Sequence, residues 1–357
     1  RRSVVIVCFA ASLLRCAAAL TMLDLQRLHH IDLDGEPLGQ KAVALGLLAP
    51  NYLLFPGVDI QLQGTAHLPD EPVIYAMNHT DRYNYWPFQF RLWWSQQRFT
   101  ATWVKGKYYQ NPLLGKFMEW MNNIPTVSRG YLIARDFKNV LERDPTDEEY
   151  RLLRSLVDAT AYRRDAEGPT EAELSRLPGE IFDTPRDMLG LDYKPPRHDY
   201  AGRLNTLFQA MMRRFVELNG EAFDKGLDLL VFPEGTRSKR LARGRIGLSQ
   251  IALKFQRPVV PVGCNGSDQV YPGDSPVAEK GRIVYRIGEP VGPRQMQPYL
   301  PEEDYEPFTP AAETDHRERF QSFVDLVMGR INELLDPRYR ASAETEAEAA
   351  KGASRFV

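Results

Sequence analysis

The chain has 357 residues, of which 43% are apolar and 26% are charged, and its formal net charge is −2. This length is enough for one sizeable core with an inserted subdomain, and the composition excludes disorder for most of the chain. The slightly acidic balance argues against a dedicated nucleic-acid-binding protein, which is usually strongly basic. Cys8, Cys16 and Cys264 are too few and too scattered for a disulfide framework or a zinc site, so we expect a reducing, cytoplasmic setting and no metal.

Residues 1–21 are predicted to be absent from the mature protein, because they carry the signs of a signal peptide. Two arginines open the chain, an apolar run follows from Val4 to Leu14, and small residues come next. A single membrane span is the alternative, but the run is shorter than the roughly 20 residues that cross a bilayer, and Arg15 interrupts it. Residues 1–40 are therefore predicted to be an N-terminal segment outside the main domain.

Two apolar segments are open to more than one interpretation. Residues 41–55 are too few to cross a membrane, but they suit a segment that lies on its surface or a helix that packs on the core. Residues 86–99 are rich in tryptophan and phenylalanine, which fits a core helix, an apolar tunnel or a membrane-facing surface. The sequence leaves these alternatives open.

Apolar runs typical of strands alternate with amphipathic segments typical of helices through the rest of the chain. Residues 58–64 alternate polar with apolar side chains, whereas 73–77 and 229–231 are continuously apolar, as in buried strands. Residues 204–226 repeat apolar side chains at helical spacing. This alternation predicts an α/β fold with a mixed, largely parallel sheet that is flanked by helices.

Residues 131–200 interrupt this pattern and are predicted to form a helical insertion. Thr146 with Glu149, and Thr170 with Glu173, have the Thr-x-x-Glu spacing of capping boxes, which begin helices. Around the insertion, the sequence predicts an α/β domain of residues 41–130 and 201–300, a C-terminal helix within 301–340 and a mobile tail over 341–357.

Residues 232–238, Phe-Pro-Glu-Gly-Thr-Arg-Ser, directly follow a predicted buried strand. Gly235 allows the backbone to turn close to a ligand, Thr236 offers a hydroxyl, and Arg237 offers a planar fork of donors suited to phosphate or carboxylate. An anion site is therefore predicted at this strand end. Four more basic residues lie just downstream: Lys239, Arg240, Arg243 and Arg245.

The stretch 232–238 resembles the third motif of the glycerolipid acyltransferases, the family that includes 1-acylglycerol-3-phosphate acyltransferase. The family's first motif, Asn-His-x4-Asp after a strand, corresponds to Asn78-His79, but Asn84 stands at the position of the aspartate. The resemblance extends from about residue 58 to residue 290, outside the insertion. The second motif, an arginine that closes a strand, corresponds to Arg129 with Lys105 upstream, and the fourth resembles Val260-Pro261-Val262.

The resemblance implies a peripheral enzyme on the cytoplasmic side of a membrane. It would move a fatty acyl group from acyl-CoA or acyl carrier protein to a lysophospholipid, with 1-acylglycerol 3-phosphate as the expected acceptor, and it would need no cofactor besides this acyl donor. His79 is the expected general base, since histidine has a suitable pKa near neutrality. Arg129 and Arg237 would bind the phosphate of the acceptor, and Glu234 would bind its glycerol hydroxyl or orient Arg237.

Asn84 leaves three alternatives for the expected base. Asp81, two residues after His79, would supply a carboxylate if the backbone there is extended. Asn84 would itself orient the ring more weakly, since it carries no charge and its NH2 group can also face the imidazole. In the third alternative the protein binds lipid without turning it over, and a further alternative keeps the enzyme but changes the headgroup of the acceptor.

Overall fold

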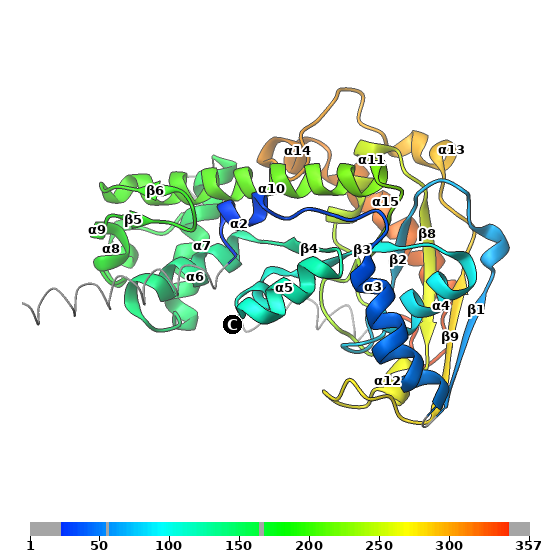
Figure 1. Ribbon diagram of the computed structural model, residues 1–357. Coiled ribbons are helices and arrows are strands. Elements are labelled where there is room, and N and C mark those ends of the chain that lie inside the picture. Colours follow the sequence, from blue (N-terminus) through cyan, green and yellow to red (C-terminus); the bar gives the residue numbers. More distant parts are fainter. Residues whose placement is uncertain (1–22, 55–56, 164–167, 343–357) are drawn as a thin grey trace, which may run out of the picture. The chain divides into compact units, whose positions relative to one another are not determined.

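The structure is a computed structural model that describes residues 23–54, 57–163 and 168–342 (Figure 1). The described chain forms two compact units. One contains the residues up to Asp32 and Val104–Phe215, and the other contains Leu33–Trp103 and the residues from Val216 onward. The predictions for residues 1–21 and for the tail from residue 343 lie outside the described ranges.

A seven-stranded sheet is built mainly by the second unit, and its order is β1-β9-β8-β2-β7-β3-β4. The pairs β1–β9, β2–β7, β2–β8 and β3–β7 are parallel, whereas β8 and β9 are antiparallel. The structure thus confirms the predicted mixed, largely parallel sheet. Its strands are β1 (Val58–Gln63), β2 (Ile74–Met77), β3 (Thr100–Lys105), β4 (Asn123–Thr126), β7 (Asp228–Val231), β8 (Val259–Asn265) and β9 (Gly281–Ile287).

The centre of the sheet is buried on both faces. Every residue of β2, β7 and β8 is buried, whereas β9 alternates buried with half-exposed or exposed residues, so one face of β9 is wet. Because β2, β7 and β8 are mutually aligned in parallel, their carboxyl ends meet at one edge of the sheet. In α/β proteins this edge is where ligands are bound.

Helices of the second unit cover both faces of the sheet (Figure 1). On one face, Phe88 of α4 meets Tyr285 of β9, with 5.2 Å between ring centroids. Tyr285 is paired with Cys264, so Gly263 points to the other face, where Leu334 at the end of α15 packs against it. The helices are α3 (Leu38–Val43), η1 (Ala44–Leu48), η2 (Pro50–Leu54), α4 (Trp86–Gln96), α11 (Gly247–Phe255), α12 (Ser267–Val270), α13 (Pro293–Met296), α14 (Pro310–Asp315) and α15 (Arg317–Glu333).

The two apolar segments that the sequence left open have one buried side each. In the helical segment Leu38–Leu54, Leu48 and Tyr52 are buried in the core, but other leucines are exposed. In α4, Phe88 and Phe90 are buried, while Trp94 is 49% exposed. Within the described residues, no helix combines the length and the apolar character that crossing a membrane requires.

The first unit is mainly helical and includes the predicted insertion. Thr146 and Thr170 each cap a helix through the predicted capping box. In each box the glutamate, Glu149 or Glu173, accepts a hydrogen bond from the backbone N–H of the capping threonine. A small antiparallel pair, β5 (Arg186–Asp187) and β6 (Asp192–Tyr193), lies within the insertion. The helices are α2 (Leu25–His29), η4 (Gly106–Tyr109), α5 (Pro112–Trp120), α6 (Arg129–Leu141), α7 (Asp147–Tyr162), α8 (Glu171–Leu174), α9 (Glu180–Asp183) and most of α10 (Tyr200–Asp224).

Candidate active site

The chain leaves β2 through Asn78, which is almost fully buried. Its Nδ2 donates to the carbonyl of Cys264 at 3.0 Å, and its Oδ1 accepts from the Cys264 N–H at 2.7 Å. The Asn78 side chain thus continues the pairing between β2 and β8 beyond Met77, the last residue of β2. These two bonds fix the backbone at the start of the loop that carries His79.

Asn84 determines which nitrogen of His79 carries the proton. Its Nδ2 donates to the carbonyl of Asn78 at 2.8 Å, so its Oδ1 faces His79 Nδ1 at 3.1 Å. An amide oxygen only accepts, and therefore Nδ1 bears the hydrogen and Nε2 keeps the lone pair. Tyr285 anchors the carbonyl of Asn84 through its hydroxyl at 2.6 Å. Asn84 thus orients the ring in the tautomer that a general base at Nε2 requires.

Asp81 has a different set of partners. Its Oδ1 accepts from the Tyr83 N–H and its Oδ2 accepts from the Thr80 hydroxyl, both at 2.9 Å. Burial raises the pKa of this carboxyl above its usual value. These bonds close a turn in the loop after His79, while the part of Asp81 in a reaction stays a prediction.

The stretch 232–238 begins directly after β7 and holds His79 from three sides. The ring of Phe232 stacks on the imidazole, with 4.1 Å between centroids and 21° between planes. Glu234 Oε1 accepts from the His79 N–H at 2.8 Å, and the Ser238 N–H donates to the His79 carbonyl at 2.8 Å. Both backbone groups of His79 are therefore satisfied by this one loop.

Glu234 connects two segments of the backbone at the site. It is 2% exposed, and its second oxygen accepts from the Ala242 N–H at 2.8 Å. Burial raises the pKa of Glu234 to about 8, although both backbone N–H groups oppose the rise. The two oxygens of Glu234 join the backbone at His79 to the backbone at Ala242, while its contacts with the acceptor and with Arg237 stay predictions.

The tip of this loop is open to solvent. Gly235 has a φ of 69°, a left-handed conformation that favours glycine, and a side chain there would meet Arg245. Thr236 is half-buried and Arg237 is exposed. Among the described residues, neither side chain has a hydrogen bond or an ion pair, so both remain available to a ligand.

Arg129 and Lys105 belong to the first unit. Lys105 is the last residue of β3 and is half-buried. Arg129 was expected to close a strand, but it opens α6 directly after the capping residue Ser128. This is a correction, and its cause is that Ser128 accepts a hydrogen bond from the Tyr131 N–H and thereby begins a helix.

The guanidinium of Arg129 is buried without an acidic partner among the described residues. It donates to Asn205 Oδ1 at 3.0 Å and to the Tyr162 hydroxyl at 3.2 Å, and it lies 4.5 Å from the ring centroid of Phe208. Its Nη2 is buried and has no hydrogen-bond partner there. A buried cation is costly unless an anion compensates it, so this position favours an anionic ligand.

In the described part of the chain, no group of three or more His, Cys, Asp or Glu side chains is arranged to hold a metal ion. The end of β2 brings together one oriented imidazole, the buried carboxyl groups of Asp81 and Glu234, and an exposed cationic loop.

Comparisons with known proteins find a likeness to solved structures. No protein-family model matches the chain, and no curated protein matches it. A solved structure, the 1-acyl-sn-glycerophosphate (LPA) acyltransferase PlsC from Thermotoga maritima, matches with a TM-score of 0.37 and 15% sequence identity. The match covers 87% of this chain and 79% of that chain.

Proposed function

We propose that this chain is an acyltransferase that moves a fatty acyl group from a thioester to a hydroxyl of a lysophospholipid, and specifically to 1-acylglycerol 3-phosphate. The observation that carries the proposal is the hydrogen bond between His79 Nδ1 and Asn84 Oδ1, which leaves the lone pair on Nε2. The resemblance of the sequence motifs to those of the glycerolipid acyltransferases, with the departure at Asn84, supports the same assignment.

In the proposed reaction, His79 Nε2 removes the proton of the acceptor hydroxyl while the oxygen attacks the thioester carbonyl. The tetrahedral intermediate then expels the thiolate of the donor, and the proton on Nε2 passes to that sulfur. The acyl group ends on the acceptor oxygen and the imidazole returns to its starting tautomer. Acyl-CoA and acyl carrier protein are both suitable donors, because each presents the same thioester.

Recognition of the phosphate is assigned to arginines. Arg237 is exposed in the stretch 232–238, which contacts His79. A guanidinium binds two phosphate oxygens at once through two parallel hydrogen bonds. Arg129 belongs to the first unit and is proposed by itself as an anion ligand, because its buried charge has no acidic partner among the described residues. Glu234 positions the loop, and Lys105 is kept as a candidate substrate contact on the resemblance alone.

We further propose that the enzyme works on the cytoplasmic surface of a membrane, where its lipid acceptor resides. Support comes from the helical segment Leu38–Leu54, which exposes several leucines to solvent. Leu45 is 55% exposed, Leu53 57% and Leu54 71%. An apolar strip of this kind on a helix suits the boundary between lipid headgroups and acyl chains.

Asn84 also favours a second candidate function, a lipid-binding protein that does not turn lipid over. Asparagine accepts the Nδ1 hydrogen bond but supplies no negative charge to stabilise the imidazolium. Thiol release from an acyl thioester by the purified full chain separates the two candidates. Turnover that is lost in His79→Ala supports the enzyme, and lipid binding without turnover supports the second candidate.

His67→Ala is the matched control for that experiment. His67 lies in the same unit, but its Nδ1 is 3.1 Å from the carbonyl of Ile287. β8 lies between β9 and β2 in the sheet, so this contact of His67 is two strands away from the strand that leads to His79. Loss of turnover in both variants would reject a specific role for His79.

A further inference from the structure

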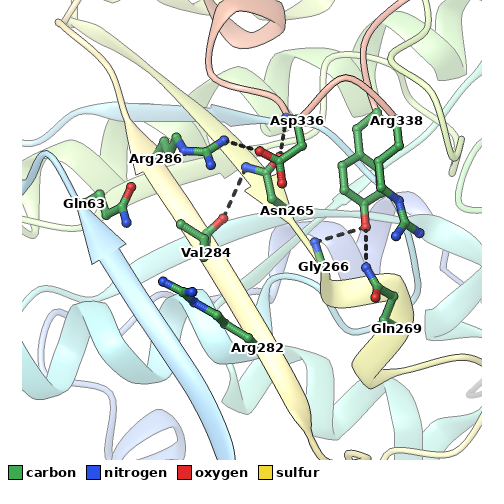
Figure 2. Close-up of a pocket in the computed structure, with 10 residues that line it drawn as sticks. Gln63, Asn265, Gly266, Gln269, Arg282, Val284, Arg286, Asp336 and Arg338 are labelled. Atoms are coloured by element: carbon green, nitrogen blue, oxygen red, sulfur yellow. Dashed lines mark hydrogen bonds and ion pairs between the residues drawn. The ribbon is translucent and has the colours of Figure 1, made fainter.

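A hollow of about 310 Å³ lies on the wet face of the sheet, beside β1 and β9 (Figure 2). Arg282 and Arg286 line it from β9, Asn265 and Gly266 line it from the end of β8, and Arg338 lines it from the C-terminal segment, residues 334–340. Figure 2 shows the two arginines of β9 on one side of Asn265 and Gly266, and Arg338 on the other side. All of these residues belong to the second unit.

The framework of the hollow is held by satisfied polar groups. Asn265 is 2% exposed, and its Nδ2 donates to carbonyls on either side of it, including that of Leu334 at 3.3 Å. Its Oδ1 accepts from the Asp336 N–H at 2.7 Å. The hydroxyl of Tyr339, a residue that is 1% exposed, accepts from the Gly266 N–H at 3.1 Å. These hydrogen bonds fix the C-terminal segment, which carries Arg338, against the end of β8.

Each of the three guanidinium groups keeps unused donors among the described residues. Arg282 uses Nε towards Asp59 and Nη2 towards Gln61, which leaves Nη1. Arg286 uses Nη1 alone, for the carbonyl of Leu334 and for Asp336, which leaves Nε and Nη2.

Arg338 uses Nη2 towards Asp268 at 3.3 Å, which leaves Nε and Nη1. A guanidinium has five N–H donors, so one neighbouring carboxylate does not satisfy it. Of the residues that line the hollow, three are arginines and Asp336 is the single carboxylate among them. Each arginine thus faces one carboxylate and still offers unused N–H donors to the hollow.

We propose that this hollow binds a small molecule that carries a phosphoryl group. Tetrahedral phosphate oxygens accept forked hydrogen bonds from several arginines at once, whereas a single carboxylate accepts only one such pair. The volume of about 310 Å³ accommodates a phosphate with an attached organic group. The site is separate from the imidazole site and does not depend on the proposed acyl transfer.

A hydrogen-bonded path connects the hollow to His79. The carbonyl of Tyr339 accepts from the Leu241 N–H at 2.8 Å. The next residue, Ala242, donates its N–H to one oxygen of Glu234. The other oxygen of Glu234 accepts from the His79 N–H. A ligand that joins Arg338 to the arginines of β9 would stabilise the segment that supports the loop of His79.

Isothermal titration calorimetry of the full chain with inorganic pyrophosphate and with AMP tests the site. We expect Arg282→Gln and Arg338→Gln each to weaken pyrophosphate binding about tenfold, the effect of losing one charge-assisted contact. Arg294→Gln is the control, since Arg294 is exposed in α13 and does not line the hollow. All titrations are repeated in an Arg237→Gln background, which removes the phosphate contact proposed for the acceptor.

Binding that persists in Arg237→Gln and weakens in Arg282→Gln or in Arg338→Gln supports the site, and tighter binding of AMP than of pyrophosphate identifies a nucleotide as the source of the phosphoryl group. If the wild-type chain binds neither probe, or if both hollow variants bind as tightly as the Arg294→Gln control, the proposal is overturned. Circular dichroism of each variant confirms that it is folded.

Discussion

Replacing Asn84 by aspartate puts a carboxylate where an amide oxygen now faces His79 Nδ1. The two atoms are 3.1 Å apart and Asn84 is fully buried, so the new charge acts at short range with little solvent screening. It favours the imidazolium that forms when Nε2 takes the proton of the acceptor. The same substitution removes the donor that binds the carbonyl of Asn78 at 2.8 Å.

The size of each effect follows from these contacts. An opposite charge at this distance raises the pKa of a histidine by about 1 to 3 units, and each unit is worth about 1.4 kcal/mol. We expect a rise of the pKa at the low end of this range, because the new carboxylate is buried without its hydration and faces the carbonyl oxygen of Asn78. A gain of about 1.4 kcal/mol in the stability of the imidazolium corresponds to a rise in kcat of about tenfold. The loss of the bond to Asn78 should lower the free energy of unfolding by about 1 to 3 kcal/mol.

Two measurements check this prediction. Thiol release from an acyl thioester gives kcat over a range of pH, and urea unfolding gives the free energy of unfolding of the same samples. Asn84→Ala is the companion variant, since it offers no acceptor to Nδ1 and should lower kcat. A folded Asn84→Asp protein whose kcat equals or falls below that of the wild type would refute the argument that residue 84 acts through the imidazole.

Three further predictions concern the loop and the surface. Burial raises the pKa of Glu234 from its usual 4.5 to about 8 in the folded protein, so the folded state holds this proton more tightly than the unfolded chain does. The free energy of unfolding should therefore fall as pH rises from about 4.5 to about 8, and Glu234→Gln should remove most of that dependence in urea titrations. Arg237→Gln should raise the KM for a phosphate-bearing acceptor about tenfold or more and leave the KM for a neutral acceptor unchanged. Replacing Leu53 and Leu54 together by serine should reduce binding to anionic lipid vesicles in a flotation assay, without a change in the unfolding midpoint.

Each of these predictions has its own contrary result. A stability that rises with pH over that interval would show that Glu234 is ionised in the folded state. Equal rises in KM for both acceptors in Arg237→Gln would mean that the arginine orders the loop and does not bind phosphate. Unchanged flotation of the leucine variant would place the membrane contact elsewhere, and Leu38→Ser, at a site that is 70% exposed, is the next variant to compare.

The sequence was enough to predict the fold class, because buried strands can be recognised from their continuous apolar runs. Continuous apolar runs at 73–77 and 229–231 identified buried strands, and Thr146 and Thr170 marked two helix starts that the structure confirms. Polar residues after two such runs pointed to the edge of the sheet where Asn78, His79 and the loop 232–238 lie together. Periodicity and capping are local properties, so a single sequence reveals them.

The roles within the site depended on contacts between distant residues, which no local pattern encodes. Glu234 reaches the backbone of His79 across 155 positions of the chain, and Tyr285 fixes Asn84 across 201. The direction of the Asn84 amide depends on the carbonyl of Asn78, so the tautomer of His79 was open until that bond was seen. The arginines of the hollow come from β9 and from the C-terminal segment, and their spacing in the sequence gives no sign that they meet.

Transfer of an isotopically labelled acyl group tests the central claim most directly. The purified full chain is mixed with a labelled acyl thioester and 1-acylglycerol 3-phosphate, and the initial rate of labelled diacyl product is measured by mass spectrometry. We predict steady product formation by the wild-type chain and by His67→Ala, and none above background by His79→Ala. Product formation at the wild-type rate by a folded His79→Ala protein would contradict the proposed reaction.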